Sequence, residues 1–441
     1  MKLRRVAFGS IFFFLLLVVT CVGLEIGGRV FVAIQGRQLH DEQLARLEAF
    51  TVDKLMQRVA APKFALNLLW GFGHAHGFGP LDYFEDTGAP YNYPLSKEEF
   101  VKRVGDITAN NFGFEADRDY PADLPSDAYV VGLFGGSVAE FLYAVAREDL
   151  QQELSRALGR KVVVLNFALS AAKQPQQLDI LTFFMALGQR FDLVLNLDGI
   201  NEAWHPALNA QADISAGFPV YSIISPVLPE ISVKASEYVV QAQRLVDLLG
   251  LLQSVVRWNH ATVNSRFVDL VATTVFGSEE QRLHKRLMMI TYEGRPKMRP
   301  RTVTLPRFSR LFDTDDPVEQ GLRIWMESAR MMAQVAHGRG AEYIEFIQPS
   351  PHVTKKEFTK EERAVGLPAK DELMSRGYAR LLAKIDDLRS AGIKIHSLAD
   401  LFEETREPVY VDNCCHVNVL GNRMMVDAIV ARLRTELASR Q

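Results

Sequence analysis

The sequence predicts an α/β fold, in which a parallel β-sheet lies between two layers of helices, preceded by one transmembrane helix. Three observations lead to this expectation. From residue 128 onward, short apolar runs typical of strands buried on both faces alternate with longer helical stretches. Polar, glycine- or asparagine-containing segments follow several of these runs, where open α/β sheets bind their ligands. The N-terminus carries an uncharged run long enough to cross a bilayer.

The N-terminal run extends from Val6 to Leu24 and follows three basic residues, Lys2, Arg4 and Arg5. Its 19 residues rise by ~1.5 Å each, which roughly matches the ~30 Å hydrocarbon core. Cleaved signal peptides usually have a shorter apolar stretch of ~7–15 residues, so we expect an uncleaved anchor. The basic residues before the run place the N-terminus in the cytoplasm. The rest of the chain is then expected in the periplasm, on a single-pass protein of a bacterial inner membrane.

Composition excludes several classes of protein. Of the 441 residues, 48% are hydrophobic and 23% are charged, which excludes a disordered chain. The formal net charge of −3 gives no footprint for nucleic acid. Three cysteines, Cys21, Cys414 and Cys415, are too few for a disulfide framework. The adjacent Cys414 and Cys415 are expected to act as small hydrophobic side chains.

The α/β pattern divides the chain into three parts: residues 1–24, a membrane-proximal region over 25–125, and an α/β domain over 126–441. Within that domain, apolar runs predict strands at 128–134, 161–167, 191–197, 341–349 and 393–398. Helical patterns cover residues 138–158, 174–187, 370–390 and 421–437.

A helical insertion over residues 206–340 interrupts this alternation. Asp316 and Pro317 predict the N-cap and first turn of a helix that ends at Gly338. Between Arg282 and Arg310 there are nine basic residues and one acid, with prolines that keep the stretch extended. This stretch is either a solvated loop or a contact for a polyanion, such as an acidic glycan or anionic lipid headgroups.

Two histidines, His74 and His76, lie in the apolar, glycine-rich stretch 65–84. An H-x-H pair can ligate a metal ion, but no Cys, Asp or further His follows at ligand spacing. A packed or membrane-facing loop is therefore the favoured interpretation, and we expect neither a metal nor a cofactor.

Four segments could carry chemistry. Gly135-Gly136-Ser137 follows the first strand, and two glycines allow a sharp turn that exposes the serine hydroxyl. Residues 166–171 follow the second strand, and residues 198–202 (DGINE) follow the third, with an asparagine that could point toward the same space. Residues 411–422 precede the last helix and contain Asp412 and His416, close enough for the carboxylate to orient the imidazole. Taken singly, each is more often a cap or a loop.

In this order the four segments resemble the SGNH hydrolases, also called the GDSL family. Ser137 matches the family's nucleophile, residues 199–202 (GINE) match its third block, and His416 matches its general base. Residues 110–114 (NNFGF) resemble an element found before the first strand of many membrane-anchored members. The resemblance covers about residues 108–205 and 340–437 and implies a three-layer α/β/α sandwich.

The resemblance also implies site residues. Ser137 would attack an ester carbonyl, His416 would take its proton, and Asp412 would orient His416. The oxyanion hole would consist of the N–H groups of Ser137 and Ala168 and the side chain of Asn201. Two positions depart from the family pattern: alanine replaces the glycine of the second block, and Asp412 lies one residue too early, with Asn413 in the customary place.

The same resemblance implies that Gly136, Gly199 and Glu202 line the substrate site.

Three functions stay open at this stage. The first is a membrane-anchored esterase or O-acyltransferase, which passes an acyl group from serine to water or to a sugar hydroxyl, possibly of a cell-envelope polysaccharide. The second is a catalytically silent relative that binds a glycan or a membrane-protein partner. The third is a structural envelope protein that uses residues 206–340 as its interface.

Overall fold

The computed structural model describes residues 20, 22–27, 29–30, 44, 64–74, 80, 95–105, 107–224, 235–292, 304–368 and 371–438. The chain divides into two compact units. One consists of Met1–Ala61 with Ser232–Glu293, and the other of Pro62–Ile231 with Gly294–Gln441. The second unit is the α/β body.

A five-stranded parallel sheet forms the centre of the α/β body, in the order β6-β5-β7-β8-β9. Its strands are β5 (Tyr129–Gly135), β6 (Val162–Asn166), β7 (Leu193–Asp198), β8 (Glu342–Ile347) and β9 (Ile395–Ser397). All residues of β6 and β7 are buried, as expected for strands covered on both faces. The order reverses direction at β5, so the turns after β5 and β7 meet at the carboxyl edge, where such sheets place their ligands.

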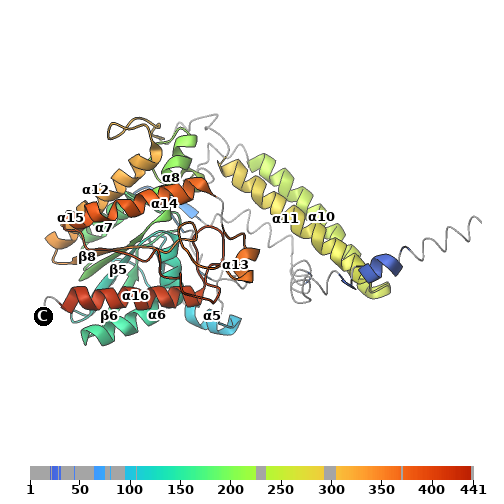
Figure 1. The fold of residues 1–441 in the computed structure, drawn as a ribbon, viewed down its shortest axis with the longest axis horizontal. Coiled ribbons are helices and arrows are strands. Elements are labelled where there is room, and N and C mark those ends of the chain that lie inside the picture. The colour runs from blue at the N-terminus through green and yellow to red at the C-terminus, as the bar shows by residue number, and fades with distance from the viewer. Residues whose placement is uncertain are drawn as a thin grey trace, which may run out of the picture. The chain divides into compact units, whose positions relative to one another are not determined.

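Helices cover both faces of the sheet (Figure 1). On one face, α6 (Ser137–Leu158) packs against α16 (Val419–Ala438). On the other face lie α7 (Gln176–Ala186), α8 (Ile200–Gln211), α12 (Pro317–Gly338), α14 (Glu372–Ala383) and α15 (Ile385–Ser390). The predicted α/β class, with a parallel sheet between two helical layers, is confirmed.

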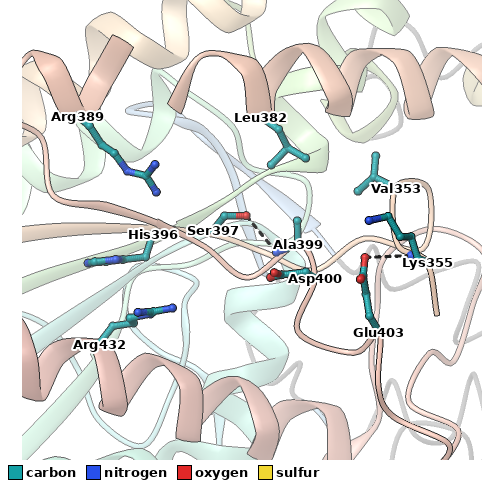
Figure 2. A pocket seen from close by; sticks show the side chains of 10 residues that line it. All are labelled: Val353, Lys355, Leu382, Arg389, His396, Ser397, Ala399, Asp400, Glu403 and Arg432. Atoms are coloured by element: carbon teal, nitrogen blue, oxygen red, sulfur yellow. Dashed lines mark hydrogen bonds between the residues drawn. The ribbon is translucent and has the colours of Figure 1, made fainter. Parts of the chain in front are cut away.

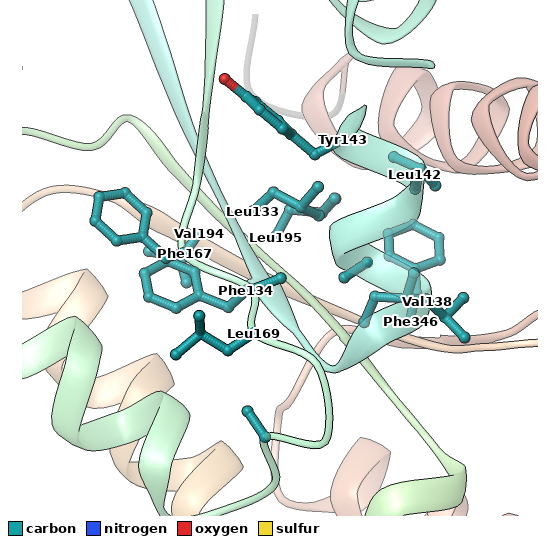
Figure 3. Close-up of a cluster of buried hydrophobic side chains, with 14 of the residues drawn as sticks. Leu133, Phe134, Val138, Leu142, Tyr143, Phe167, Leu169, Val194, Leu195 and Phe346 are labelled. Atoms are coloured by element: carbon teal, nitrogen blue, oxygen red, sulfur yellow. The ribbon is translucent and has the colours of Figure 1, made fainter. Parts of the chain in front are cut away.

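The core beneath the start of α6 is built from aliphatic and aromatic side chains (Figure 3). Phe134 of β5 stacks on Phe167 with their ring centroids 5.1 Å apart. Val138 and Leu142, one helical turn apart on α6, are buried in the same cluster as Phe346. This packing holds the first turn of α6, and therefore Ser137, in one place.

The helix boundaries differ from the sequence expectations at several points. The predicted helix 370–390 is two helices, because Lys384 caps the end of α14 and the start of α15 and belongs to neither. The expected helix 174–187 begins only at Gln176, after Pro175. The cap of α12 is confirmed: the Asp316 side chain accepts hydrogen bonds from Val318 and Glu319, and the helix ends at Gly338.

The structure divides the region 206–340 differently from the expected insertion. Pro206 lies inside α8, and both α8 and α12 pack in the α/β body. The residues that leave this body form a helical hairpin of α10 (Ala235–Thr262) and α11 (Arg266–Tyr292). The basic stretch begins inside α11 rather than in an extended segment, because Arg282, Lys285 and Arg286 are helical.

The described part of the chain contains no helix that is both long and apolar enough to cross a membrane. Most of the run Val6–Leu24 falls outside the described residues, so the anchor stays a prediction.

Short elements precede the sheet. Strands β1 (Phe64–Asn67) and β2 (Gly71–His74) pair antiparallel, and so do β3 (Thr108–Ala109) and β4 (Glu115–Ala116). Between them lies α5 (Lys97–Val104), which packs on α6. His74 ends β2, whereas His76 lies outside the described residues. The α/β body also contains the short helices α9 (Tyr221–Ile224) and α13 (Lys360–Ala364).

Candidate active site

Ser137 is the first residue of α6, directly after a sharp turn from β5. Gly135 adopts φ 146°, a conformation that favours glycine, and a Cβ there would lie 2.4 Å from the carbonyl oxygen of Leu197. The next residue, Gly136, is the N-cap of α6. The two glycines therefore let the chain pass close to β7 before the helix begins, as the sequence predicted for this turn.

Ser137, His416 and Asp412 form a continuous chain of hydrogen bonds. The Oγ of Ser137 lies 2.7 Å from Nε2 of His416. On the other side of the ring, Nδ1 of His416 lies 2.5 Å from Oδ2 of Asp412. Phe141, one turn along α6, packs edge-to-face against the imidazole of His416, with the two ring centroids 5.2 Å apart. Residues 279 positions apart in sequence thus meet in the geometry of a nucleophile, a base and an orienting acid.

The loop before α16 explains why the early position of the aspartate is tolerated. Oδ1 of Asp412 accepts hydrogen bonds from the backbone N–H groups of Cys414, Cys415 and His416 at 2.9, 3.0 and 3.2 Å. The chain therefore wraps around this carboxylate, and the wrap leaves Oδ2 facing the imidazole. The side chain of Asn413 packs near Gly366 instead. Of the two candidates, Asp412 is the one that contacts His416.

The electrostatics of the pair favour the charged forms. Burial lowers the pKa of His416, but the charge and hydrogen bond of Asp412 outweigh burial and raise that pKa to about 9. Burial likewise opposes ionisation of Asp412, yet His416 and the backbone donors hold the pKa of this carboxyl below its ordinary value. Each member of the pair therefore stabilises the charged form of the other.

Asn201 brings an amide next to the serine. It lies in the first turn of α8, and its Nδ2 donates to the carbonyl oxygen of Ala172 at 2.8 Å. A Cβ on Gly136 would lie only 2.2 Å from this nitrogen, so the amide packs directly over Gly136. Gly136 therefore serves the close approach of Asn201. One N–H of the amide is used by Ala172, which leaves the second for another acceptor.

The N–H of Ala168, the expected oxyanion donor, already has an acceptor two residues earlier in the chain. It donates to Oδ1 of Asn166 at 3.0 Å, and the residue is fully buried. Three residues later, Ala171 adopts φ 65°, the left-handed region usually occupied by glycine, and is partly exposed. The glycine-like position of this loop is thus Ala171. No glycine marks this position in the sequence, so the motif pattern pointed to Ala168 instead.

Gly199 and Glu202 are both buried, and their contacts hold the loop at the start of α8. A Cβ on Gly199 would lie 2.6 Å from Cγ of Gln348, so this glycine allows close packing. Glu202 is buried; its Oε2 accepts from the N–H of Gly199 at 2.9 Å and its Oε1 from that of Gln174 at 3.3 Å. Burial, followed by the charge of Asp198, raises the pKa of Glu202 well above its ordinary value. These contacts fix the loop that starts α8; that the two residues also line a substrate site stays a prediction.

Sequence reasoning missed a buried polar cluster behind the serine. Glu140 lies one turn after Ser137 on α6, and its Oε1 is 2.5 Å from Nε2 of His74. Its other oxygen accepts a hydrogen bond from the hydroxyl of Ser170, next to Ala171. The H-x-H pair marked His74, but Glu140 has no signal of its own in a helix.

Glu115 lies in the same cluster, and possible metal-ligand atoms of His74, Glu115 and Glu140 lie within 4.8 Å of one another. One imidazole and two carboxylates are a donor set that divalent transition metals accept. The hydrogen bond between His74 and Glu140 accounts for their closeness without an ion.

A cavity of about 470 Å³ lies at the edge strand β9 (Figure 2). Its lining combines basic side chains, Arg389, Arg432 and Lys355, with the acids Asp400 and Glu403. None of the residues that line it belongs to the Ser137–His416–Asp412 chain.

Comparisons with known proteins do not assign the chain to a family. No protein-family model matches the sequence, and no curated protein matches it either. Among solved structures, a lipase/acylhydrolase from Enterococcus faecalis is similar over 70% of this chain and 96% of its own, with 9% identity and a TM-score of 0.29. The lipase Lip_vut3 from a goat rumen metagenome is similar over 69% of this chain and 96% of its own, with 13% identity and a TM-score of 0.27. Both scores are too low to carry an argument, so the functional case rests on the side chains.

Proposed function

We propose that the chain is an SGNH-type serine esterase or O-acyltransferase that works through an acyl-serine intermediate. The observation that supports this most is the hydrogen-bonded chain from Ser137 through His416 to Asp412. A serine hydroxyl is a weak nucleophile on its own and needs an adjacent base that a third group orients. All three parts lie at hydrogen-bonding distance.

The chemistry follows from these positions. Neutral His416 accepts the proton of Ser137 through Nε2 as Oγ attacks the ester carbonyl, and Asp412 stabilises the imidazolium that forms. We propose that the developing oxyanion is bound by the N–H groups of Ser137 and Ala171 and by the second N–H of Asn201. His416 then returns the proton to the departing alcohol. The acyl group leaves the serine when water, or a sugar hydroxyl, attacks it.

A fluorophosphonate probe tests this proposal, because it labels only a serine that a neighbouring base activates. We expect labelling of the intact chain and none of the Ser137→Ala variant. The matched control is Ser254→Ala, which removes an exposed hydroxyl on α10 that bonds only within its own helix; this variant should label like the wild type. If the wild type does not label at all, the alternative of a catalytically silent binding protein is favoured.

We also propose that Val6–Leu24 anchors the protein in a bacterial inner membrane with the α/β body in the periplasm. Support comes from the 19 uncharged residues and the basic residues before them. An acceptor in the cell envelope, such as a polysaccharide hydroxyl, would then be within reach. The anchor would be supported if the full chain stays in the membrane during carbonate extraction. A variant that lacks residues 1–24 should then be released.

Hydrolase and transferase differ in what takes the acyl group. An acyl-enzyme formed from an ester with a radiolabelled acyl group is incubated with water alone or with an added polysaccharide. A hydrolase releases the labelled acid, whereas a transferase moves the label to the polysaccharide. A membrane-protein partner is a further proposal that co-purification from membranes would test.

A further inference from the structure

The turn of the α10–α11 hairpin is hydrogen-bonded to Glu25, the residue that directly follows the proposed anchor. Glu25 is the first charged residue after the run Val6–Leu24 and lies in a helical segment, 22–27. Its Oε2 accepts hydrogen bonds from Oγ of Ser265 at 2.5 Å and from the N–H of Phe267 at 3.2 Å. Its Oε1 accepts from the N–H of Arg266 at 3.2 Å. Residues 240 positions apart in sequence thus meet at the start of α11.

This contact involves an ionised carboxylate. Burial opposes the charge of Glu25, but the hydrogen bonds from Ser265, Arg29 and the backbone of α11 together lower the pKa of Glu25 to about 2. A charge-assisted contact with the exposed N–H groups of a helix start is among the stronger hydrogen-bond arrangements.

The hairpin turn itself is held by Asn259. Its Nδ2 donates to the carbonyl oxygen of Ser265 at 2.9 Å and to Oδ1 of Asp269 at 2.8 Å. Its Oδ1 accepts from the N–H of Ser265 at 2.8 Å. Asn259 and Asp269 are both fully buried. The end of α10 and the start of α11 therefore form one fixed structure, and Glu25 is attached to it.

Apolar side chains are exposed at this end of the hairpin. Leu251, Val255 and Trp258 are 61%, 36% and 57% exposed, and their spacing places them on one face of α10. This stripe covers about 10 Å of helix at ~1.5 Å per residue. Val263, in the turn, is 59% exposed.

The hairpin's own core faces the other way, through Leu252, Val256, Ala272 and Phe276. The exposed stripe is therefore additional to the packing between the two helices. Arg257, beside Trp258, is exposed as well.

We propose that the stripe Leu251–Val255–Trp258 and Val263 lie in the interface of the lipid bilayer, at the level where the N-terminal helix leaves it. We choose the bilayer as the partner of this stripe because Glu25 lies one residue beyond the apolar run and is hydrogen-bonded to the hairpin turn. Tryptophan is enriched at the membrane–water interface, and an adjacent arginine suits anionic headgroups. This inference rests on the proposed membrane anchor.

Tryptophan fluorescence of the full chain in vesicles tests the proposal. The wild type and the Trp258→Phe variant are reconstituted into phosphatidylcholine–phosphatidylglycerol vesicles, with and without lipids brominated near the headgroup. The difference between the two proteins reports Trp258 alone. We expect that difference signal to be blue-shifted and to fall by at least half with brominated lipid.

The matched control is Trp204→Phe, because Trp204 lies in α8 of the α/β body. The difference signal of Trp204 should not change with brominated lipid.

Two results would overturn the proposal, and they differ. In the first, the chain floats with the vesicles in a density gradient but Trp258 is not quenched. The anchor then stands, the hairpin does not touch lipid, and the stripe would instead contact a protein partner. If the chain does not float with vesicles, the anchor fails and the hairpin proposal fails with it. Labelling of Ser137 by the fluorophosphonate is independent of both results, so failure of the proposed catalysis is recognised separately.

Discussion

Replacing Asp412 by Asn changes one atom of the site and tests its electrostatics. Oδ1 of Asp412 accepts three backbone N–H groups, and an asparagine oxygen can keep these bonds, so the loop is expected to keep its shape. The other position changes from an acceptor to an NH₂ donor, which cannot accept a proton from Nδ1 of His416. The ring would then hold its proton on Nε2, where the base must be free.

The magnitude follows from the pKa of His416. The rise from 6.5 to about 9 corresponds to roughly 3 kcal/mol of stabilisation of the imidazolium, at ~1.4 kcal/mol per pH unit. Loss of that stabilisation alone is about a 10²-fold effect. Together with the wrong tautomer, the fall in kcat should reach about 10⁴-fold.

The assay is hydrolysis of an activated ester such as p-nitrophenyl acetate between pH 5 and 10. Because only neutral His416 can act as the base, kcat/KM of the wild type should rise with pH until about 9. In Asp412→Asn the pKa of the imidazole falls, so the smaller remaining activity should reach its plateau at lower pH.

The matched control is Asn413→Ala, which removes the neighbouring side chain that packs near Gly366. Its kcat should stay within about threefold of the wild type, because Asn413 does not contact His416. An Asp412→Asn variant that keeps a tenth or more of wild-type kcat, with an unchanged pH profile, would refute the reasoning.

Three further changes test the surroundings of the serine. Asn201→Ala removes one of the three proposed oxyanion donors, so kcat should fall by about 10²–10³-fold with little change in KM. Gly135→Ala places a Cβ 2.4 Å from the Leu197 carbonyl at φ 146°, and should lower the free energy of unfolding in urea by about 2–4 kcal/mol. Glu140→Gln puts an NH₂ where a carboxylate oxygen accepts from His74 or Ser170, and should cost about 1–3 kcal/mol in the same experiment.

Controls and contrary outcomes are specific to each change. Gly338→Ala, at a glycine of α12 with open space around it, should change stability by less than about 1 kcal/mol. Equal losses at Gly135 and Gly338 would contradict the steric argument. A rise in KM without a fall in kcat for Asn201→Ala would place the amide in ground-state binding. Unchanged stability of Glu140→Gln would mean that the buried cluster contributes no net free energy.

Local features of the sequence determined the elements and the chemical residue types. Mostly apolar runs predicted all five strands of the sheet, because strands buried on both faces are rich in apolar residues, although buried polar side chains such as Asn196 of β7 and Glu345 of β8 interrupt them. Asp316 and Pro317 predicted the start of α12, because capping depends on residues a few positions apart. The ordered motifs predicted Ser137, Asn201 and His416 as neighbours, and the structure brings them to one edge of the sheet.

Tertiary structure alone decided which hydrogen-bond partner each buried polar group has. The N–H of Ala168 donates to the Asn166 side chain, and the Glu202 carboxylate accepts hydrogen bonds from backbone N–H groups of two different loops. The contacts of Glu140 with His74 and of Glu25 with Ser265 join segments 66 and 240 residues apart. No local pattern records such pairs, because hydrogen bonds depend on distance in space and the sequence carries only the order of residues along the chain.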